Sequence, residues 1–203
     1  MIKGFLLVPF VGALYSLFFG LLPATRREGI SGRFFLESLS LTVIVSTLGV
    51  LGICSIHPVI FLLATYLITM RVRLALDLGS ALARRGRVES AWSIYAFASR
   101  LWPDQQGALL VLINKAACSL RQGNPQAAIP QLERVLVGAT EARLGLKYLA
   151  ACHYNLGLAY WRVERIAQAR GEFQTVMDIW PLSPYARRAE DQLSKMGEAV
   201  SNP

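Results

Sequence analysis

The chain has 203 residues, 54% of them hydrophobic, and its mean hydropathy of +0.41 is high for a soluble domain. Its formal net charge of +8 suits an anionic lipid surface, nucleic acid or an acidic protein partner equally well. The sequence has two histidines, three cysteines and no C-x-x-C, Gly-rich phosphate loop, G-x-S-x-G or H-E-x-x-H motif. This composition argues against a disulfide framework, a metal site and an active site. We therefore expect no enzymatic activity, no cofactor and no small-molecule substrate.

The isolated cysteine and histidine side chains fit structural roles. Cys54, Cys118 and Cys152 are expected to be buried free thiols. His57 precedes a proline and is expected at a turn, and His153 is expected to pack within a helical repeat.

The first third of the chain is almost free of charge. Residues 4–25 carry none, and their 22 residues match the ~20 that a helix needs to cross a bilayer. A cleaved signal peptide starting at Lys3 is the alternative, but Leu22-Pro23-Ala24 is a poor cleavage site and a second apolar run follows. We expect a membrane span over 4–25.

The second apolar run, residues 38–70, is longer than one span requires. A straight helix of this length would reach ~50 Å, whereas the apolar core of a bilayer is ~30 Å thick. Pro58 disfavours helical geometry at His57, so two short spans over 38–54 and 58–73 are expected. A single kinked and tilted span, giving two spans in all, is the alternative.

The arginines favour three spans. One cluster lies between the first and second apolar runs and another follows the last run, and three spans place both on the cytoplasmic side. These clusters consist of Arg26, Arg27 and Arg33, and of Arg71, Arg73, Arg84, Arg85 and Arg87. We therefore expect an integral membrane protein whose region 71–203 is cytoplasmic.

Small residues recur along the first predicted span at intervals of four. Gly12, Ser16 and Gly20 form a seam on which another membrane helix could pack. The alternative is that this spacing only reflects the abundance of small residues in membrane helices.

The last third of the chain contains two amphipathic helical patterns joined by a short polar turn, within residues 155–181. Small residues and bulky apolar residues recur at helical spacing, and a proline ends the second helical pattern. The pattern is Leu156, Gly157, Tyr160, Ala169, Phe173, Val176 and Pro181. It resembles the tetratricopeptide repeat, a pair of helices with these residue types at these offsets.

Two further copies of this pattern lie upstream. The first copy contains Leu78, Gly79, Leu82, Gly86, Ala91, Tyr95, Ala98 and Pro103. The second is less regular and contains Ala116, Gly123, Ala128, Leu132 and Val135, with Ser119 and Thr140 at the tyrosine and proline positions and Pro130 inside its second helix. Repeats are thus expected over about 72–105, 109–140 and 150–183.

The resulting fold prediction is all-α. Transmembrane helices within residues 1–70 precede a solenoid of three stacked hairpins in 71–203, because one hairpin cannot bury its apolar stripe alone. Residues 184–200 are expected to close the stack as a capping helix, with Ser183 as its N-cap and Pro184 as its first residue. The third span is expected to continue directly into the first repeat.

The resemblance also implies a binding face, since the first helices of tetratricopeptide repeats line a concave groove. By position, these residues are Arg73, Leu76, Ser80, Ala83 and Arg84; Leu110, Ile113, Ala117, Leu120 and Arg121; and Ala151, Tyr154, Leu158, Trp161 and Arg162. The candidate partner-binding residues among them are Arg73, Arg84, Ile113, Ala117, Leu120, Arg121, Tyr154, Leu158, Trp161 and Arg162.

Three of these residues, Arg84, Arg121 and Arg162, occupy the same repeat position. They could bind carboxylates of a partner, or they could offset the dipole of their own helix C-termini. The carboxylate-clamp subfamily needs lysine and asparagine at groove positions where this chain has Leu76, Ser80, Tyr154 and Leu158, which argues against an acidic chaperone C-terminus as the ligand.

The function that follows is a membrane-anchored adaptor that binds a protein or peptide in an apolar, arginine-rimmed groove and contacts membrane lipid. One alternative is a subunit or assembly factor of a membrane complex, whose spans make the main contacts. A second alternative is a basic helical repeat that binds nucleic acid. The arginines argue against it, because they are dispersed over both helix types. Replacing Tyr154 and Trp161 by alanine is expected to abolish partner capture without unfolding the repeats.

Overall fold

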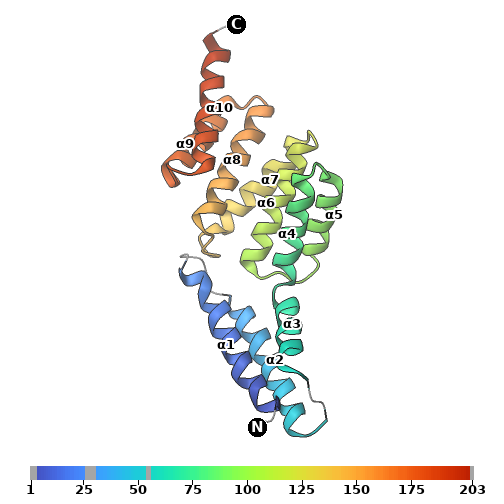
Figure 1. Cartoon of the computed structure of the whole chain (residues 1–203). Coiled ribbons are helices and arrows are strands. Elements are labelled where there is room, and N and C mark those ends of the chain that lie inside the picture. The colour runs from blue at the N-terminus through green and yellow to red at the C-terminus, as the bar shows by residue number, and fades with distance from the viewer. Residues whose placement is uncertain (1–3, 26–30, 54–55, 202–203) are drawn as a thin grey trace. The chain divides into compact units, whose positions relative to one another are not determined.

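A computed structural model of the chain describes residues 4–25, 31–53 and 56–201 (Figure 1). The described residues form helices and no strand, so the all-α prediction is confirmed for them. The helices are α1 (Gly4–Thr25), α2 (Gly32–Val50), α3 (Pro58–Thr69), α4 (Arg71–Arg84), α5 (Val88–Ala98), α6 (Gln105–Arg121), α7 (Pro125–Ala139), α8 (Leu146–Arg162), α9 (Ile166–Ile179) and α10 (Pro184–Ser201). They form two compact units, residues 1–74 and residues 75–203.

In the 1–74 unit, α1, α2 and α3 pack side by side (Figure 1). The α2 helix begins at Gly32 instead of residue 38, because the Ser31 hydroxyl accepts a hydrogen bond from the Phe34 amide and caps its first turn. The charged residues Arg33 and Glu37 therefore lie within the helix. Near its C-terminus, Gly52 adopts a φ of +70°, the left-handed conformation that ends many helices.

The turn at His57 is confirmed. The His57 ring accepts a hydrogen bond from the Val59 amide and Pro58 occupies the first turn of α3. The α2 and α3 helices are separate and pack against each other, so residues 38–70 do not form one continuous helix; the number of membrane spans stays a prediction. Cys54 lies outside the described residues.

The third predicted span does not continue into the first repeat, and this expectation is wrong. The α3 helix ends at Thr69, and Met70 breaks the helical conformation with φ −97° and ψ 7° before α4 begins at Arg71. The side chain of Arg71 also donates to the Ile68 carbonyl, which satisfies a carbonyl at the end of α3.

By length and hydropathy, α2 is the one helix in the described part of the chain that could cross a membrane alone. Helices α3 and α4 satisfy the same criteria only if they are counted together as one broken span. Residues 7–22 within α1 form a shorter apolar stretch.

The 75–203 unit consists of helical hairpins stacked in chain order and closed by α10 (Figure 1). Each hairpin has a fully buried alanine at the same position of its second helix: Ala91, Ala128 and Ala169. The α7 helix continues through Pro130. Ser183 accepts a hydrogen bond from the Ala186 amide at the start of α10, so its predicted capping role is confirmed.

The two helices of each hairpin meet at a pair of residues with complementary volumes. A Cβ atom added to Gly79 would lie 2.4 Å from Tyr95, and one added to Gly157 would lie 2.7 Å from Phe173. The second hairpin has Ala116 at the glycine position and Leu132, a smaller partner, at the aromatic position, both fully buried. The larger Ala116 at the glycine position is therefore compensated by the smaller Leu132 at the aromatic position of the second helix.

Candidate interaction face

The first-helix face of the 75–203 unit comprises the predicted groove residues of α4 from Ala75 onward, of α6 and of α8. Ile113 and Leu120 are 6% and 4% exposed, so they lie in the core and present no surface to a partner. Arg73 is exposed but falls in the 1–74 unit, so it is not counted as part of the face of the 75–203 unit. The remaining predicted residues are partly or fully exposed: Arg84, Ala117, Arg121, Tyr154, Leu158, Trp161 and Arg162.

Two of the recurring arginines bind the backbone of the preceding repeat. Arg121 on α6 donates from Nη1 to the Ala83 carbonyl on α4 at 2.7 Å. Arg162 on α8 donates in the same way to the Leu120 carbonyl on α6. Each guanidinium thus donates a further hydrogen bond to a carbonyl in the last turn of the neighbouring first helix, which also accepts the amide of Gly86 or Gly123. We call this arrangement the arginine ladder.

The ladder changes the interpretation of these arginines. They act on the helix of the preceding repeat, whereas the sequence suggested their own helix or a ligand as alternatives. A guanidinium has five N–H donors and the backbone bond uses one, so other donors of Arg121 and Arg162 stay available at a fixed position. Arg84 is exposed, and the structure gives it no such bond.

Replacing Arg121 or Arg162 by alanine should lower the free energy of unfolding of the repeat unit by about 1 kcal/mol, because each loses a charged hydrogen bond between repeats. Arg84→Ala should change it by less than about 0.5 kcal/mol. The free energy of unfolding is measured by urea unfolding of the full chain in detergent, with tryptophan fluorescence as the signal. All four tryptophans, Trp92, Trp102, Trp161 and Trp180, lie in the repeat unit. Equal losses in the three variants would contradict the ladder and favour an effect of each arginine on its own helix.

Tyr154 has a structural role that the sequence did not reveal. Its ring lies 5.8 Å from Phe173 on α9 and 5.9 Å from Tyr185 on α10, measured between ring centroids. Burial raises the pKa of Tyr154, which is consistent with a side chain held between helices. Truncating Tyr154 would remove packing of the capping helix, so the expectation that this change leaves the fold intact is corrected. Trp161 is the better position at which to test binding.

The other titratable groups of the third hairpin hold helices together. Tyr160 donates from Oη to Glu133 at 2.8 Å, and burial, together with that carboxylate, raises the pKa of Tyr160 to about 12. His153 contacts Glu172 through Nδ1 at 2.6 Å, so it packs between α8 and α9 as predicted. Cys118 and Cys152 are buried and free as predicted, and burial raises the pKa of Cys152 to about 12.

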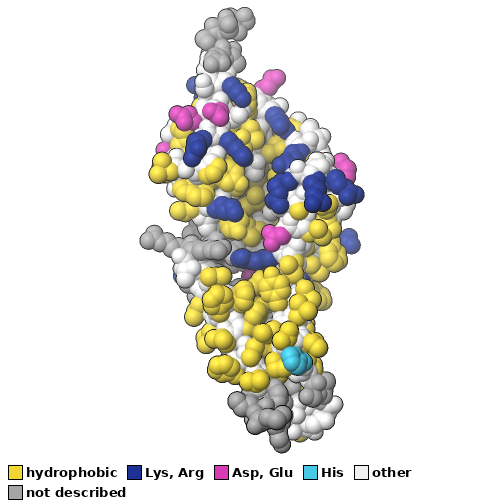
Figure 2. Space-filling view, viewed as in Figure 1, with side chains coloured by type: hydrophobic (Ala, Val, Ile, Leu, Met, Phe, Trp, Pro, Cys, Tyr) yellow, Lys and Arg dark blue, Asp and Glu magenta, His cyan; other side chains and the backbone are white. Residues whose placement is uncertain are grey.

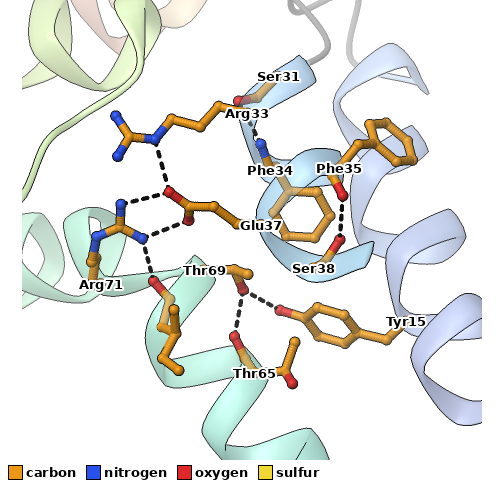
Figure 3. Close-up of polar contacts among 11 residues, drawn as sticks. Tyr15, Ser31, Arg33, Phe34, Phe35, Glu37, Ser38, Thr65, Thr69 and Arg71 are labelled. Carbon is orange, nitrogen blue, oxygen red and sulfur yellow. Dashed lines mark hydrogen bonds and ion pairs between the residues drawn. The ribbon is translucent and has the colours of Figure 1, made fainter. Parts of the chain in front are cut away.

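Half-buried polar contacts join the helices of the 1–74 unit, and sequence reasoning missed them (Figure 3). Arg71 binds Glu37 through two hydrogen bonds of 2.6 and 2.8 Å, and Arg33 reaches the same carboxylate at 2.8 Å. Tyr15 and Thr69 share a hydrogen bond of 2.6 Å between their hydroxyls. The i,i+4 spacing of Arg33 and Glu37 was visible in the sequence, whereas the contact with Arg71 joins residues 34 positions apart.

The small-residue seam of α1 packs on α2. A Cβ atom at Gly12 would lie 2.4 Å from Thr42, and one at Gly20 would lie 2.3 Å from Phe35. Between them, the Ser16 hydroxyl donates to Ser38 at 2.9 Å. The spacing of four therefore reflects helix packing and not only the composition of an apolar segment.

The outer surface of the 1–74 unit is apolar (Figure 2). The residues buried among its helices are mostly small or polar, together with Val8, Tyr15 and Phe61, whereas most large aliphatic and aromatic residues are exposed. The buried ones include Gly12, Ser16, Gly20, Ser38, Thr42 and Thr65. The exposed ones include Phe10, Leu14, Phe18, Leu36, Leu39, Val43, Ile60 and Leu63. In the same view, Lys and Arg side chains gather over the 75–203 unit (Figure 2).

The fold of the 75–203 unit is that of a helical-repeat protein. Residues 107–182 match the family described as tetratricopeptide repeat, which covers the second and third hairpins. Among solved structures, the chain is similar to the TPR2AB-domain:pHSP90 complex of yeast Sti1, with a TM-score of 0.51 and 20% sequence identity. The match covers 64% of this chain and 50% of the Sti1 chain. This chain therefore spans about half the length of the Sti1 chain that it matches. No match was found among curated proteins.

Proposed function

We propose that the chain is a membrane-anchored adaptor. The 1–74 unit lies in the bilayer, and the first-helix face binds a protein or peptide that offers apolar side chains beside carboxylates. The repeat unit is placed on the cytoplasmic side, in keeping with the distribution of arginine.

The anchor is supported by the reversed polarity of the 1–74 unit. In water, a three-helix bundle buries most of its large apolar residues, whereas this one exposes most of them and buries Gly, Ser and Thr beside Val8, Tyr15 and Phe61. This arrangement suits hydrocarbon surroundings, where small residues allow helices to approach closely and buried hydroxyls bond within the protein. Glu37 is paired with arginine, as a carboxylate at the edge of a bilayer requires.

The observation that carries the binding role is the arginine ladder beside partly exposed apolar side chains. Arg162 follows Trp161 and bonds to the helix that carries Ala117 and Arg121. Fixed guanidinium groups lose little entropy when they bind a carboxylate, and the neighbouring tryptophan adds apolar contact area. Such a face favours a partner segment with acidic and apolar residues.

The partner in the yeast Sti1 structure, pHSP90, is not carried over to this chain. The family's carboxylate clamp uses lysine and asparagine, and this chain has Leu76, Ser80, Tyr154 and Leu158 at those positions. A 20% identity supports a common fold only. The partner is therefore expected to rely more on apolar contact than a clamp ligand does.

Site-specific photo-crosslinking of the full chain in its native membrane tests the binding face. A photoreactive residue at Leu158 or Trp161 should attach a discrete protein. The same residue at Gln168, an exposed position on the second helix α9, serves as the matched control and should not attach it. The Arg121→Ala/Arg162→Ala variant should reduce the crosslink at Leu158 at least fivefold, because a carboxylate pair with arginine contributes about 1–3 kcal/mol.

Other results would favour the alternative functions. Crosslinks that form from Phe10 in α1 but not from Leu158 would indicate a membrane-complex subunit whose spans make the main contacts. Crosslinked material that nuclease removes would indicate nucleic acid. A chain that stays in the supernatant after detergent-free lysis and high-speed centrifugation would refute the anchor.

A further inference from the structure

Trp102 combines exposure with an unusual backbone conformation. Its side chain is 77% exposed, more than the other large aromatic residues of the described repeats. Its φ of +47° lies in the left-handed region, which bulky residues rarely adopt. It also precedes Pro103, which normally favours an extended backbone at this position.

Packing between repeats does not explain the exposed position of Trp102. Trp92 is covered in part by Lys115, whose Nζ lies 5.1 Å from the centre of the indole. Among the described residues, Trp102 makes no such ring contact and no side-chain hydrogen bond. Arg143 in the corresponding α7–α8 loop has the same φ of +47°, so this conformation belongs to the loops between hairpins. The exposed indole itself is the feature that indicates a role outside the folded core.

The neighbours of Trp102 suit a bilayer interface. Phe97 in the last turn of α5 is 55% exposed, and Arg100 between them is exposed. Asp104, two residues further along the chain, accepts a hydrogen bond from the Gly107 amide and caps α6. Indole rings favour the headgroup region because they are apolar with one polar N–H, and arginine pairs with lipid phosphates.

The position of Trp102 along the chain places it at the end of the first hairpin where α4 begins. The α4 helix begins one residue after α3 ends, and α5 runs back from the turn at residues 85–87. The α5–α6 loop, which contains Trp102, therefore returns to the end of the hairpin from which α4 starts (Figure 1).

We propose that Trp102, with Phe97 and Arg100, forms a second membrane contact that dips into the headgroup region of the bilayer. This inference rests on the proposed membrane anchor. It assigns an orientation to the repeat unit, in which the α5–α6 loop faces lipid. A protein partner at this loop is the competing explanation.

The test is quenching of tryptophan by brominated lipid in the full chain. The protein is reconstituted in phosphatidylcholine vesicles containing phosphatidylglycerol, with and without bromine on the acyl chains near the headgroups. Replacing three tryptophans by phenylalanine leaves Trp102 alone, and a matched variant leaves Trp92 alone. Trp102 should be quenched at least twofold more strongly than Trp92 and should emit at shorter wavelength.

A third variant separates this inference from the anchor. Phe10→Trp in a background without other tryptophans reports on α1, where Phe10 is 67% exposed. If this tryptophan is quenched and Trp102 is quenched no more than Trp92, the second contact is refuted, the anchor stands and the loop is assigned to a protein partner. If the tryptophan introduced at Phe10 is not quenched, the membrane anchor and the second membrane contact are both refuted. Because several substitutions could perturb folding, Trp102→Ala alone should also reduce the lipid quenching of total tryptophan emission, and an unchanged value would contradict the proposal.

Discussion

Replacing Gly157 by alanine is expected to lower the free energy of unfolding of the repeat unit by about 1–3 kcal/mol. The added Cβ would lie 2.7 Å from Cε1 of Phe173, whose ring is fully buried and contacts Tyr154. The ring cannot move away without disturbing the helices around it. The loss is measured by urea unfolding of the full chain in detergent with tryptophan fluorescence.

Gly171 provides the matched control for this prediction. It is also a glycine within a helix, but it is exposed and a Cβ there would meet nothing within 4 Å. Gly171→Ala should therefore stabilise α9 by up to about 1 kcal/mol, the usual gain from helix propensity. A similar effect at both positions would show that Gly157 is not required for helix contact.

The second hairpin indicates how the loss at Gly157 can be compensated. There Ala116 and Leu132 occupy the repeat positions of Gly157 and Phe173, and both are fully buried. Adding Phe173→Leu to Gly157→Ala should recover at least about 1 kcal/mol relative to the sum of the single changes, since residues in contact are not additive. Strict additivity of the two changes would contradict the proposed volume compensation.

Replacing Gly12 by leucine is expected to separate α1 from α2. Even a Cβ atom at this position would lie 2.4 Å from Oγ1 of Thr42, so a leucine cannot be accommodated without moving the helices. The hydroxyls of Ser16 and Ser38 lie 2.9 Å apart, so cysteines at these two positions should form a disulfide on oxidation. In a Cys54→Ser background, Gly12→Leu should abolish most of this bridge.

Ala13→Leu is the control for helix separation, because Ala13 is exposed on α1 and has room for a larger side chain. It should leave the Ser16→Cys/Ser38→Cys bridge intact, as judged by gel mobility without reductant in native membranes. A cysteine at Leu17, which is 55% exposed, should not form a bridge with one at Ser38. A bridge that survives Gly12→Leu would mean that the two helices do not meet along this seam.

Some features could be predicted from the sequence because they depend on neighbouring residues. The pairing of Gly157 with Phe173 involves residues on consecutive helices of one hairpin, and repetition of the pattern indicated the other hairpins. The Ser183 cap and the His57 turn also follow from local chemistry. The start of α2 was misplaced because charge was taken as a boundary, whereas Arg33 and Glu37 neutralise each other within the helix.

The candidate face was predicted less completely. Repeat position identified Trp161, Leu158 and the arginines, but it did not distinguish exposed residues from Ile113 and Leu120, which the neighbouring helices bury. Their burial depends on how closely one repeat packs on the next. The exposure of Trp102 could not be recognised for the same reason.

The sequence by itself determined the helical class, the pairing of helices into hairpins and the presence of a long apolar region, because each depends on composition and on spacing within a few turns. Only the tertiary structure decided the arginine ladder, the Glu37–Arg71 contact and the packing of the α1 seam on α2. The contacts of the Arg121 and Arg162 side chains with backbone carbonyls span 38 and 42 residues, and the contact between the Arg71 and Glu37 side chains spans 34. Local sequence patterns carry no information on contacts between residues so far apart in the chain. These contacts depend on how closely whole helices approach and at what register they pack.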